Sequence, residues 1–145
     1  AFCKRAMGRS HVVGGRDVFD CLKEYEFKLT KEYPNNARAI RSVVQDPYFD
    51  IIERAKTNCR SLKEERLSLD ASQRKGVVPH MLEPLSEAWE EFRLSRTPVL
   101  FSFADMIVSF LEDGTPPPLD LLIVDEAQDL AELNWRLVDK LASTT

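Results

Sequence analysis

The stretch that most constrains the fold of this chain is the apolar run 121–124, Leu-Leu-Ile-Val, which is followed at once by Asp125 and Glu126. A continuous apolar run of this length is typical of a strand buried on both faces of a parallel sheet. The segments 103–111 and 130–141 on either side carry apolar residues at helical spacing. The last third of the chain therefore predicts helix, strand and helix, a unit typical of α/β nucleotide-binding sheets.

The residues before about position 100 predict short amphipathic helices. Residues that favour helix starts precede several of these segments, and an apolar stripe from Leu82 to Phe92 makes Trp89 an expected core residue. The expected starts are Asp17 as an N-cap, Asp46 as an N-cap before Pro47, Ser61 with Glu64 in a capping box, a start near Pro84, and Ser102 with Asp105 in a second capping box. Gly114 is expected to end the helix that Ser102 begins. The chain as a whole predicts a mainly α fold with a small α/β part.

Composition limits the class of protein. The chain has 145 residues, of which 43% are hydrophobic and 30% charged, and its net charge is −4. These values are those of one modest globular domain without a chain-wide basic coat. Three cysteines without metal-ligand spacing favour a reduced, cytoplasmic compartment, and no apolar run approaches the roughly 20 residues that span a membrane. The first residue is Ala1 rather than Met, so we expect an excised piece of a longer protein, from a bacterial or viral source.

The polar residues after Val124 are the candidate site, because ligands of open parallel sheets bind beyond the carboxyl ends of the strands. Asp125 could hold Mg²⁺ through its water shell, and Glu126 could polarise the water that attacks a γ-phosphate. Gln128 offers an amide that could sense the γ-phosphate, and Asp129 could hold a partner loop or an arginine. The other interpretations are structural. Asp125 and Glu126 would then form a solvated turn, and Asp129 would cap the last helix together with a glutamate three residues later.

The segment 121–130, LLIVDEAQDL, resembles the Walker B region, or motif II, of superfamily 1 DNA helicases of the UvrD/Rep type. The resemblance implies that Asp125 coordinates Mg²⁺ and that Glu126 is the catalytic base. It implies that Gln128 acts in catalysis and that Gln128 and Asp129 link the nucleotide state to the DNA-binding motifs.

Two flanking stretches extend the resemblance. Residues 103–107, Phe-Ala-Asp-Met-Ile, are similar to the helix that precedes motif II in this family, with Ser102 where an Asp is common. Residues 133–135, Leu-Asn-Trp, are similar to the family's Leu-Gln-Trp stretch, with Asn134 in place of Gln. Residues 1–6 and 12–15 look like the continuation after motif Ia.

The resemblance implies three regions. Residues 1–15 would be a remnant of the RecA-like domain 1A, residues 16–98 a helical 1B-type subdomain, and residues 99–145 a segment of domain 1A that carries motif II. The fold class implied is thus a helical subdomain with an incomplete RecA-like P-loop NTPase domain. Basic side chains of the 1B-type region could contact phosphates, although a solvated surface role is the simpler interpretation for each: Lys31, Arg38, Arg41 and Lys56.

The phosphate-binding loop G-x-x-x-x-G-K-[ST] is absent from these residues. We therefore expect the isolated chain neither to hydrolyse ATP nor to unwind DNA, and the parent protein to do both as an ATP- and Mg²⁺-dependent helicase in DNA repair or replication. Its partners would be single-stranded and duplex DNA and the rest of the helicase chain, including the Walker A segment and a second RecA-like domain, and no membrane. Two alternatives stay open: a non-catalytic helical module for nucleic-acid or protein binding, and a part of a helicase-nuclease subunit.

Overall fold

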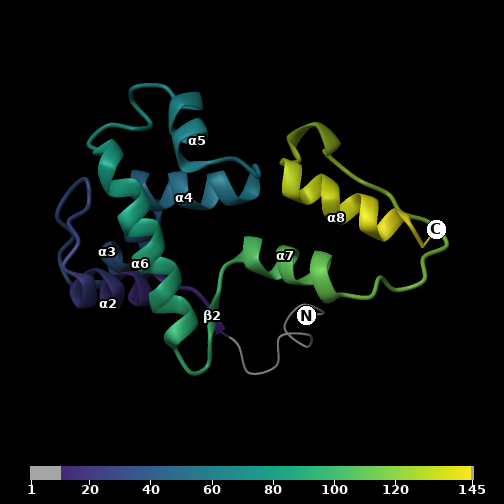
Figure 1. The fold of residues 1–145 in the computed structure, drawn as a ribbon, viewed down its shortest axis with the longest axis horizontal. Coiled ribbons are helices and arrows are strands. Elements are labelled where there is room, and N and C mark those ends of the chain that lie inside the picture. The colour runs from purple at the N-terminus through teal and green to yellow at the C-terminus, as the bar shows by residue number, and fades with distance from the viewer. Residues whose placement is uncertain (1–10, 145) are drawn as a thin grey trace.

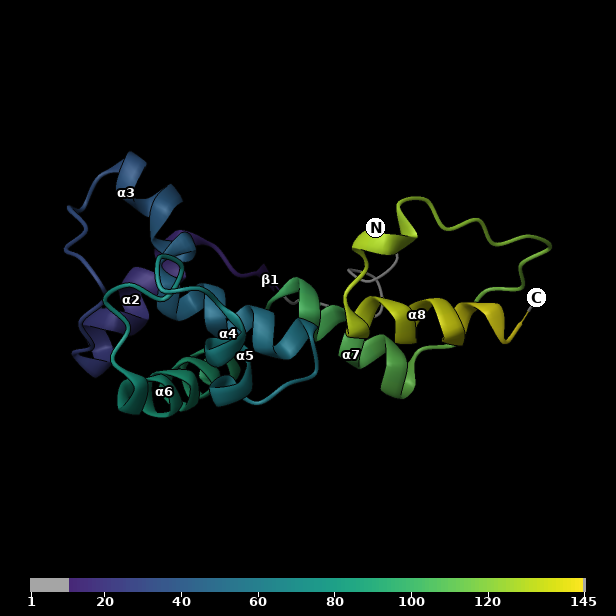
Figure 2. The same cartoon turned by 90° about the horizontal axis from the view of Figure 1, so that it is seen from above.

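The computed structural model describes residues 11–144, which form a mainly helical structure in two lobes (Figure 1). The larger lobe holds α2 to α6, and the smaller lobe holds α7 and α8, as the view from above also shows (Figure 2). None of the helices in residues 11–144 is long and apolar enough to cross a membrane. The larger lobe contains α2 (Gly15–Tyr25), α3 (Ala37–Ser42), α4 (Pro47–Thr57), α5 (Leu62–Ser68) and α6 (Leu82–Ser95), and the smaller lobe contains α7 (Phe103–Asp113) and α8 (Glu132–Ala142). Three single-turn 3₁₀ helices complete the helical elements, at Val43–Gln45, Pro79–Met81 and Ala127–Asp129.

Two short strands, β1 (His11–Val12) and β2 (Leu100–Phe101), pair in parallel. His11 lies opposite Leu100 and Val12 opposite Phe101, and the Val13 N–H donates to the Phe101 carbonyl at 3.0 Å. The whole larger lobe is inserted between these two strands in the sequence. The pairing therefore brings the beginning of the described chain next to the residues that lead into α7.

Local capping explains most of the helix starts. The Asp46 carboxylate accepts the Tyr48 N–H ahead of Pro47, and the pairs Ser61/Glu64 and Ser102/Asp105 form complete capping boxes, as expected. Gly114 ends α7, also as expected. Two predicted starts are wrong by a few residues because tertiary packing extends a helix beyond its strongest local signal. The helix assigned to an Asp17 cap begins at Gly15, where Asp17 accepts the Gly14 N–H from the third helical position, and the helix assigned to Pro84 begins at Leu82.

The core of the larger lobe lies where α2, α4 and α6 meet. Trp89 is only 2% exposed and packs edge-on against Phe49, with ring centroids 5.4 Å apart, while Phe92 stacks on its other side at 5.9 Å. This confirms the expectation that Trp89 is a core residue. Further buried side chains of the same cluster are Val18, Cys21, Val43, Tyr48, Ile51, Ile52, Leu69, Leu82, Leu85 and Leu100.

The predicted buried strand at 121–124 is wrong for the structure of these residues. Residues 114–126 form no helix or strand, and the side chains of Leu121 and Ile123 are 71% and 79% exposed. A strand needs a neighbouring strand to satisfy its N–H and C=O groups. Within residues 11–144 the only strands are β1 and β2, which pair with each other. The two expected helices are present as α7 and α8, but an irregular loop replaces the expected strand between them.

The two helices of the smaller lobe are held together at their ends. The Lys140 ammonium donates to the carbonyls of Phe110 and Leu111 at 2.8 and 2.7 Å, at the carboxyl end of α7. The Thr144 hydroxyl lies 3.2 Å from the Pro117 carbonyl. These contacts close the loop 114–131 into a hairpin, so the residues after Val124 lie between two mutually fixed helices.

Candidate functional site

The sequence-predicted site residues form one exposed turn, here called the acidic turn, made of Asp125, Glu126, Gln128 and Asp129. All four side chains are exposed. The Asp125 carboxylate accepts the Glu126 N–H at 2.9 Å, and the Gln128 amide donates to the Glu126 carboxylate. The structure thus brings Asp125, Glu126 and Gln128 into mutual contact, with carboxylate oxygens open to solvent.

Glu126 has a left-handed backbone conformation, with φ 49° and ψ 40°. Such a conformation costs a non-glycine residue roughly 1–3 kcal/mol and is concentrated at functional sites and switch regions. The strain reverses the chain direction directly before the 3₁₀ turn Ala127–Asp129, whose Asp129 N–H donates to the Glu126 carbonyl at 2.9 Å. Glu126 therefore begins the 3₁₀ turn with its side chain exposed to solvent.

Asp129 does not cap the last helix. The residue before α8 is Ala131, with no side-chain capping bond, and the helix begins at Glu132. The structural interpretation of Asp129 as an N-cap is therefore wrong, because the 3₁₀ turn places it two residues too early. Its carboxylate is exposed and lies outside the helix.

The donor set of the acidic turn suits magnesium and does not suit a structural transition-metal site. Residues 11–144 contain no cluster of three or more His, Cys, Asp or Glu side chains that could hold a metal. Mg²⁺ is typically bound through one or two carboxylates, together with water and phosphate oxygens. Asp125 and Glu126 supply that number of carboxylates, and water or phosphate oxygens would complete the coordination.

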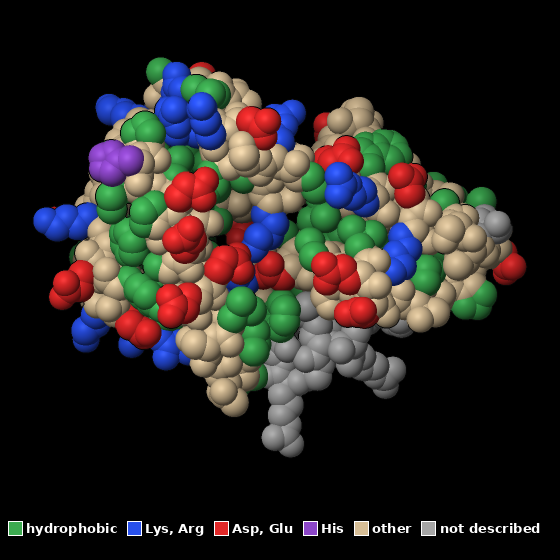
Figure 3. Space-filling view, viewed as in Figure 1, with side chains coloured by type: hydrophobic (Ala, Val, Ile, Leu, Met, Phe, Trp, Pro, Cys, Tyr) green, Lys and Arg blue, Asp and Glu red, His purple; other side chains and the backbone are tan. Residues whose placement is uncertain are grey.

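A second group of charged side chains, here called the junction cluster, lies where the two lobes meet. It consists of Lys56 from α4, Glu90 and Arg93 from α6, and Asp105 from α7. The Lys56 ammonium lies 2.7 Å from Glu90 and 2.9 Å from Asp105, and Arg93 pairs with the same two carboxylates. The Arg93 guanidinium also donates to the Leu100 carbonyl of β2 at 3.2 Å. Figure 3 shows basic and acidic side chains gathered between the lobes.

The electrostatics of the junction cluster favour its charged forms. Burial lowers the pKa of the Lys56 ammonium, but its hydrogen bonds to Glu90 and Asp105 outweigh burial and raise the pKa above its ordinary value. Burial likewise raises the pKa of the Asp105 carboxyl, but the hydrogen bonds from Lys56 and from the Ser102 N–H outweigh it and hold the pKa below its ordinary value. Lys56 and Asp105 therefore stay ionised around neutral pH.

Sequence reasoning missed the junction cluster. Its members are up to 49 residues apart, so no local pattern joins them. The one available signal was Arg93, an arginine four residues after Trp89 on the apolar face of α6, where it is 1% exposed. Lys56 was named as a candidate phosphate contact, and its two carboxylate partners make that assignment wrong for this structure.

The remaining basic candidates are exposed. Arg38 and Arg41 lie on α3, and Lys31 precedes it with its ammonium 5.1 Å from the centre of the Tyr33 ring. All three are accessible to a phosphate chain. Solvated side chains of this kind are also common on any protein surface.

Comparisons of the chain with protein-family models, with curated proteins and with solved structures returned no match. The geometry above is therefore the basis for any functional assignment.

Proposed function

We propose that this chain is part of an ATP-dependent DNA helicase of the UvrD/Rep type and that the acidic turn is half of its ATP-hydrolysing site. The observation that carries the proposal is the pair of exposed carboxylates on a strained turn, with the Gln128 amide bonded to Glu126. The LLIVDEAQDL sequence adds the resemblance to motif II.

In this proposal each side chain has a distinct task. Asp125 holds the magnesium ion through water, and the ion would neutralise charge on the nucleotide phosphates. Glu126 accepts a proton from the attacking water. Gln128 orients the Glu126 carboxylate through the bond that already joins them, and Asp129 contacts a loop that responds to the nucleotide. The phosphate-binding loop and the second RecA-like domain belong to the parent protein.

The pairing of β1 with β2 supports the proposed domain organisation. It places both ends of the helical segment at one point, as expected for a 1B-type subdomain inserted into domain 1A. The junction cluster then connects that subdomain to the helix before the acidic turn. DNA would contact the exposed basic side chains of the larger lobe.

The first prediction tests the assignment of Glu126 in the parent protein. Glu126→Gln removes the proposed base and keeps the size of the side chain, so DNA-stimulated ATP hydrolysis should fall by at least about 100-fold. Nucleotide binding, measured by equilibrium titration, should be retained. The matched control is Glu132→Gln, because Glu132 is exposed and paired with Arg136 at 3.1 Å in the following helix. Turnover in Glu126→Gln equal to that of the control would contradict the proposal.

A second candidate function is a non-catalytic helical module for nucleic-acid or protein binding. The observation that favours the module is the exposed loop 114–126, since a buried strand was expected there. The coding sequence upstream of Ala1 separates the two functions. A Walker A motif there supports the helicase, and an independent start codon near Ala1 supports the module.

A further inference from the structure

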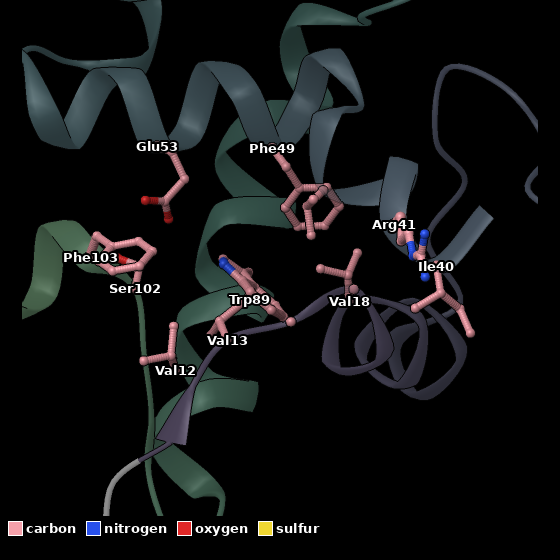
Figure 4. Close-up of a pocket in the computed structure, with 13 residues that line it drawn as sticks. Val12, Val13, Val18, Ile40, Arg41, Phe49, Glu53, Trp89, Ser102 and Phe103 are labelled. Carbon is pink, nitrogen blue, oxygen red and sulfur yellow. The ribbon is translucent and has the colours of Figure 1, made fainter. Parts of the chain in front are cut away.

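An apolar cavity of about 430 Å³ opens in the larger lobe, where β1, α2, α3, α4 and α6 meet the start of α7. Cavities of roughly 300–1,000 Å³ hold small ligands. Trp89 and Phe49 lie along it and Phe103 lies at one end (Figure 4). Two of its lining side chains reach the surface and form its mouth, Val44 at 38% and Phe103 at 75% exposure. An exposed phenylalanine beside an apolar cavity provides a surface on which a planar ring can stack.

Polar groups occur at two opposite ends of this cavity. The Glu53 carboxyl and Ser102 lie at one end, and Arg41 lies at the other, with the apolar side chains between them (Figure 4). The Ser102 hydroxyl oxygen accepts the Asp105 N–H at 3.3 Å, and the Ser102 hydroxyl lowers the pKa of the Glu53 carboxyl. A ligand must therefore offer a donor to Glu53 and an anion to Arg41, separated by an apolar body.

The end of the cavity that carries Arg41 adjoins a second, more open hollow. Arg41 also lines a neighbouring open hollow together with Arg38, Ser42 and Gln45. Two exposed guanidinium groups three residues apart lie on the same side of a helix and can hold successive phosphates. The anion site is this arginine pair and not the start of α2, because the Asp17 carboxylate already accepts the Gly14 N–H there at 2.8 Å.

The helices α2 and α3 are in close backbone contact beside the cavity. A Cβ atom at Gly15 would lie 1.7 Å from the Ile40 carbonyl oxygen, so α3 packs directly against the backbone of α2. Glycine is required at this close approach. The position of α3, which carries Arg41, is thus fixed against α2 by packed backbone.

The geometry points to a nucleotide-binding site in this cavity, selective for bases with an exocyclic amino group. The amino group donates to Glu53, the base stacks on the exposed Phe103 ring, and the phosphate pairs with Arg41. Adenine, cytosine and guanine carry such an amino group, whereas thymine does not. The nucleotide is either free or part of single-stranded DNA, and the second form rests on the proposed function.

Binding of short oligonucleotides to the 145-residue chain tests this site. Fluorescence anisotropy should give at least tenfold tighter binding for ten-residue oligo-dA and oligo-dC than for oligo-dT or an abasic strand. AMP, CMP and TMP, titrated by calorimetry, decide the source of the ligand. The same preference among the mononucleotides assigns the site to free nucleotides, and a preference confined to the strands assigns it to DNA. Equal affinity for all strands and all mononucleotides would overturn the site.

Two variants locate the binding in the cavity. Val44→Trp fills the mouth and should lower the affinity for oligo-dA about tenfold, to that for oligo-dT. Its matched control is Val78→Trp, since Val78 is similarly exposed, at 41%, and lies outside the cavity lining. Glu53→Met keeps the side-chain length and removes the acceptor, so it should abolish the preference, giving oligo-dA and oligo-dT equal affinity. Preference retained in Glu53→Met would overturn the site even if the Val44 variant failed to fold.

The experiments can overturn the cavity assignment and the ATPase assignment independently of each other. Lost turnover in Glu126→Gln with unchanged strand preference in Val44→Trp would overturn the cavity assignment alone. Retained turnover in Glu126→Gln with lost preference in Val44→Trp would overturn the ATPase assignment alone.

Discussion

Glu53 illustrates how the surroundings of a single side chain set its chemistry. Burial raises the pKa of its carboxyl above the ordinary value of 4.5. The positive charges of Lys56 and Arg93 and the Ser102 hydrogen bond lower the pKa, and the negative charge of Asp105 raises it. Burial is the largest of these effects, so the folded protein holds the Glu53 proton to higher pH than the unfolded chain does.

The raised pKa predicts that Glu53 destabilises the fold as it ionises. Between the unfolded pKa, near 4.5, and the higher folded pKa, the native state binds more protons, so the free energy of unfolding falls as pH rises. Glu53→Gln cannot ionise. Urea unfolding at a series of pH values should therefore show the Gln variant gaining stability relative to the natural protein as pH rises above 4.5, with the gain levelling off above the folded pKa. A gain that is independent of pH would contradict the assignment.

Among the elements, the loop 114–126 differs most from its sequence-based prediction. Its apolar residues alternate in exposure, with Leu121 and Ile123 outward and Leu122 and Val124 half-buried. That alternation is what a strand would show if one face were already covered and the other awaited a partner. The proposed RecA-like domain would provide the covering side chains and the neighbouring strands.

This interpretation predicts that one substitution has a small effect on the stability of the 145-residue chain and a large effect on that of the parent protein. Ile123→Asn should change the free energy of unfolding of the 145-residue chain by less than about 0.5 kcal/mol, because the side chain is 79% exposed. In the parent protein the same substitution should cost about 2 kcal/mol or more, because a buried isoleucine would be replaced by an amide. Urea titrations of both proteins measure the difference. Equal, small effects in the two contexts would favour the helical module over the helicase.

At the scale of the whole molecule, the junction cluster is the main polar connection between the lobes. It joins α4 and α6 to α7, and α7 is fixed to α8 through Lys140. The helical lobe and the acidic turn are therefore linked through a continuous set of packed elements. In the proposed helicase, this connection would transmit movement of the 1B-type lobe to the ATP site.

The junction cluster predicts that replacing Arg93 lowers the free energy of unfolding substantially. Arg93→Met removes a guanidinium that is 1% exposed and leaves Glu90 and Asp105 with only Lys56, so the free energy of unfolding should fall by about 3 kcal/mol. The control is Arg136→Met, where the arginine is 56% exposed and pairs on the surface, with an expected cost below about 0.5 kcal/mol. Urea unfolding measures both variants. A loss for Arg93→Met as small as that of the control would contradict the role of the cluster.

The sequence by itself determined the local elements of this protein. The caps at Asp46, Ser61 and Ser102, the end of α7 at Gly114 and the core position of Trp89 all follow from residues within a few positions of one another, because capping bonds and helical periodicity are local. It also grouped Asp125, Glu126, Gln128 and Asp129 as one local set of polar residues, although the strained backbone of Glu126 has no sequence signal.

Only the tertiary structure decided which distant residues meet. The parallel pairing of β1 with β2, the junction cluster and the cavity between Glu53 and Arg41 each join residues from different elements. The exposure of Leu121 and Ile123 also depends on residues that are distant in the sequence. Whether an apolar run becomes a buried strand depends on neighbouring strands that supply its hydrogen bonds, and that condition is not contained in the run itself.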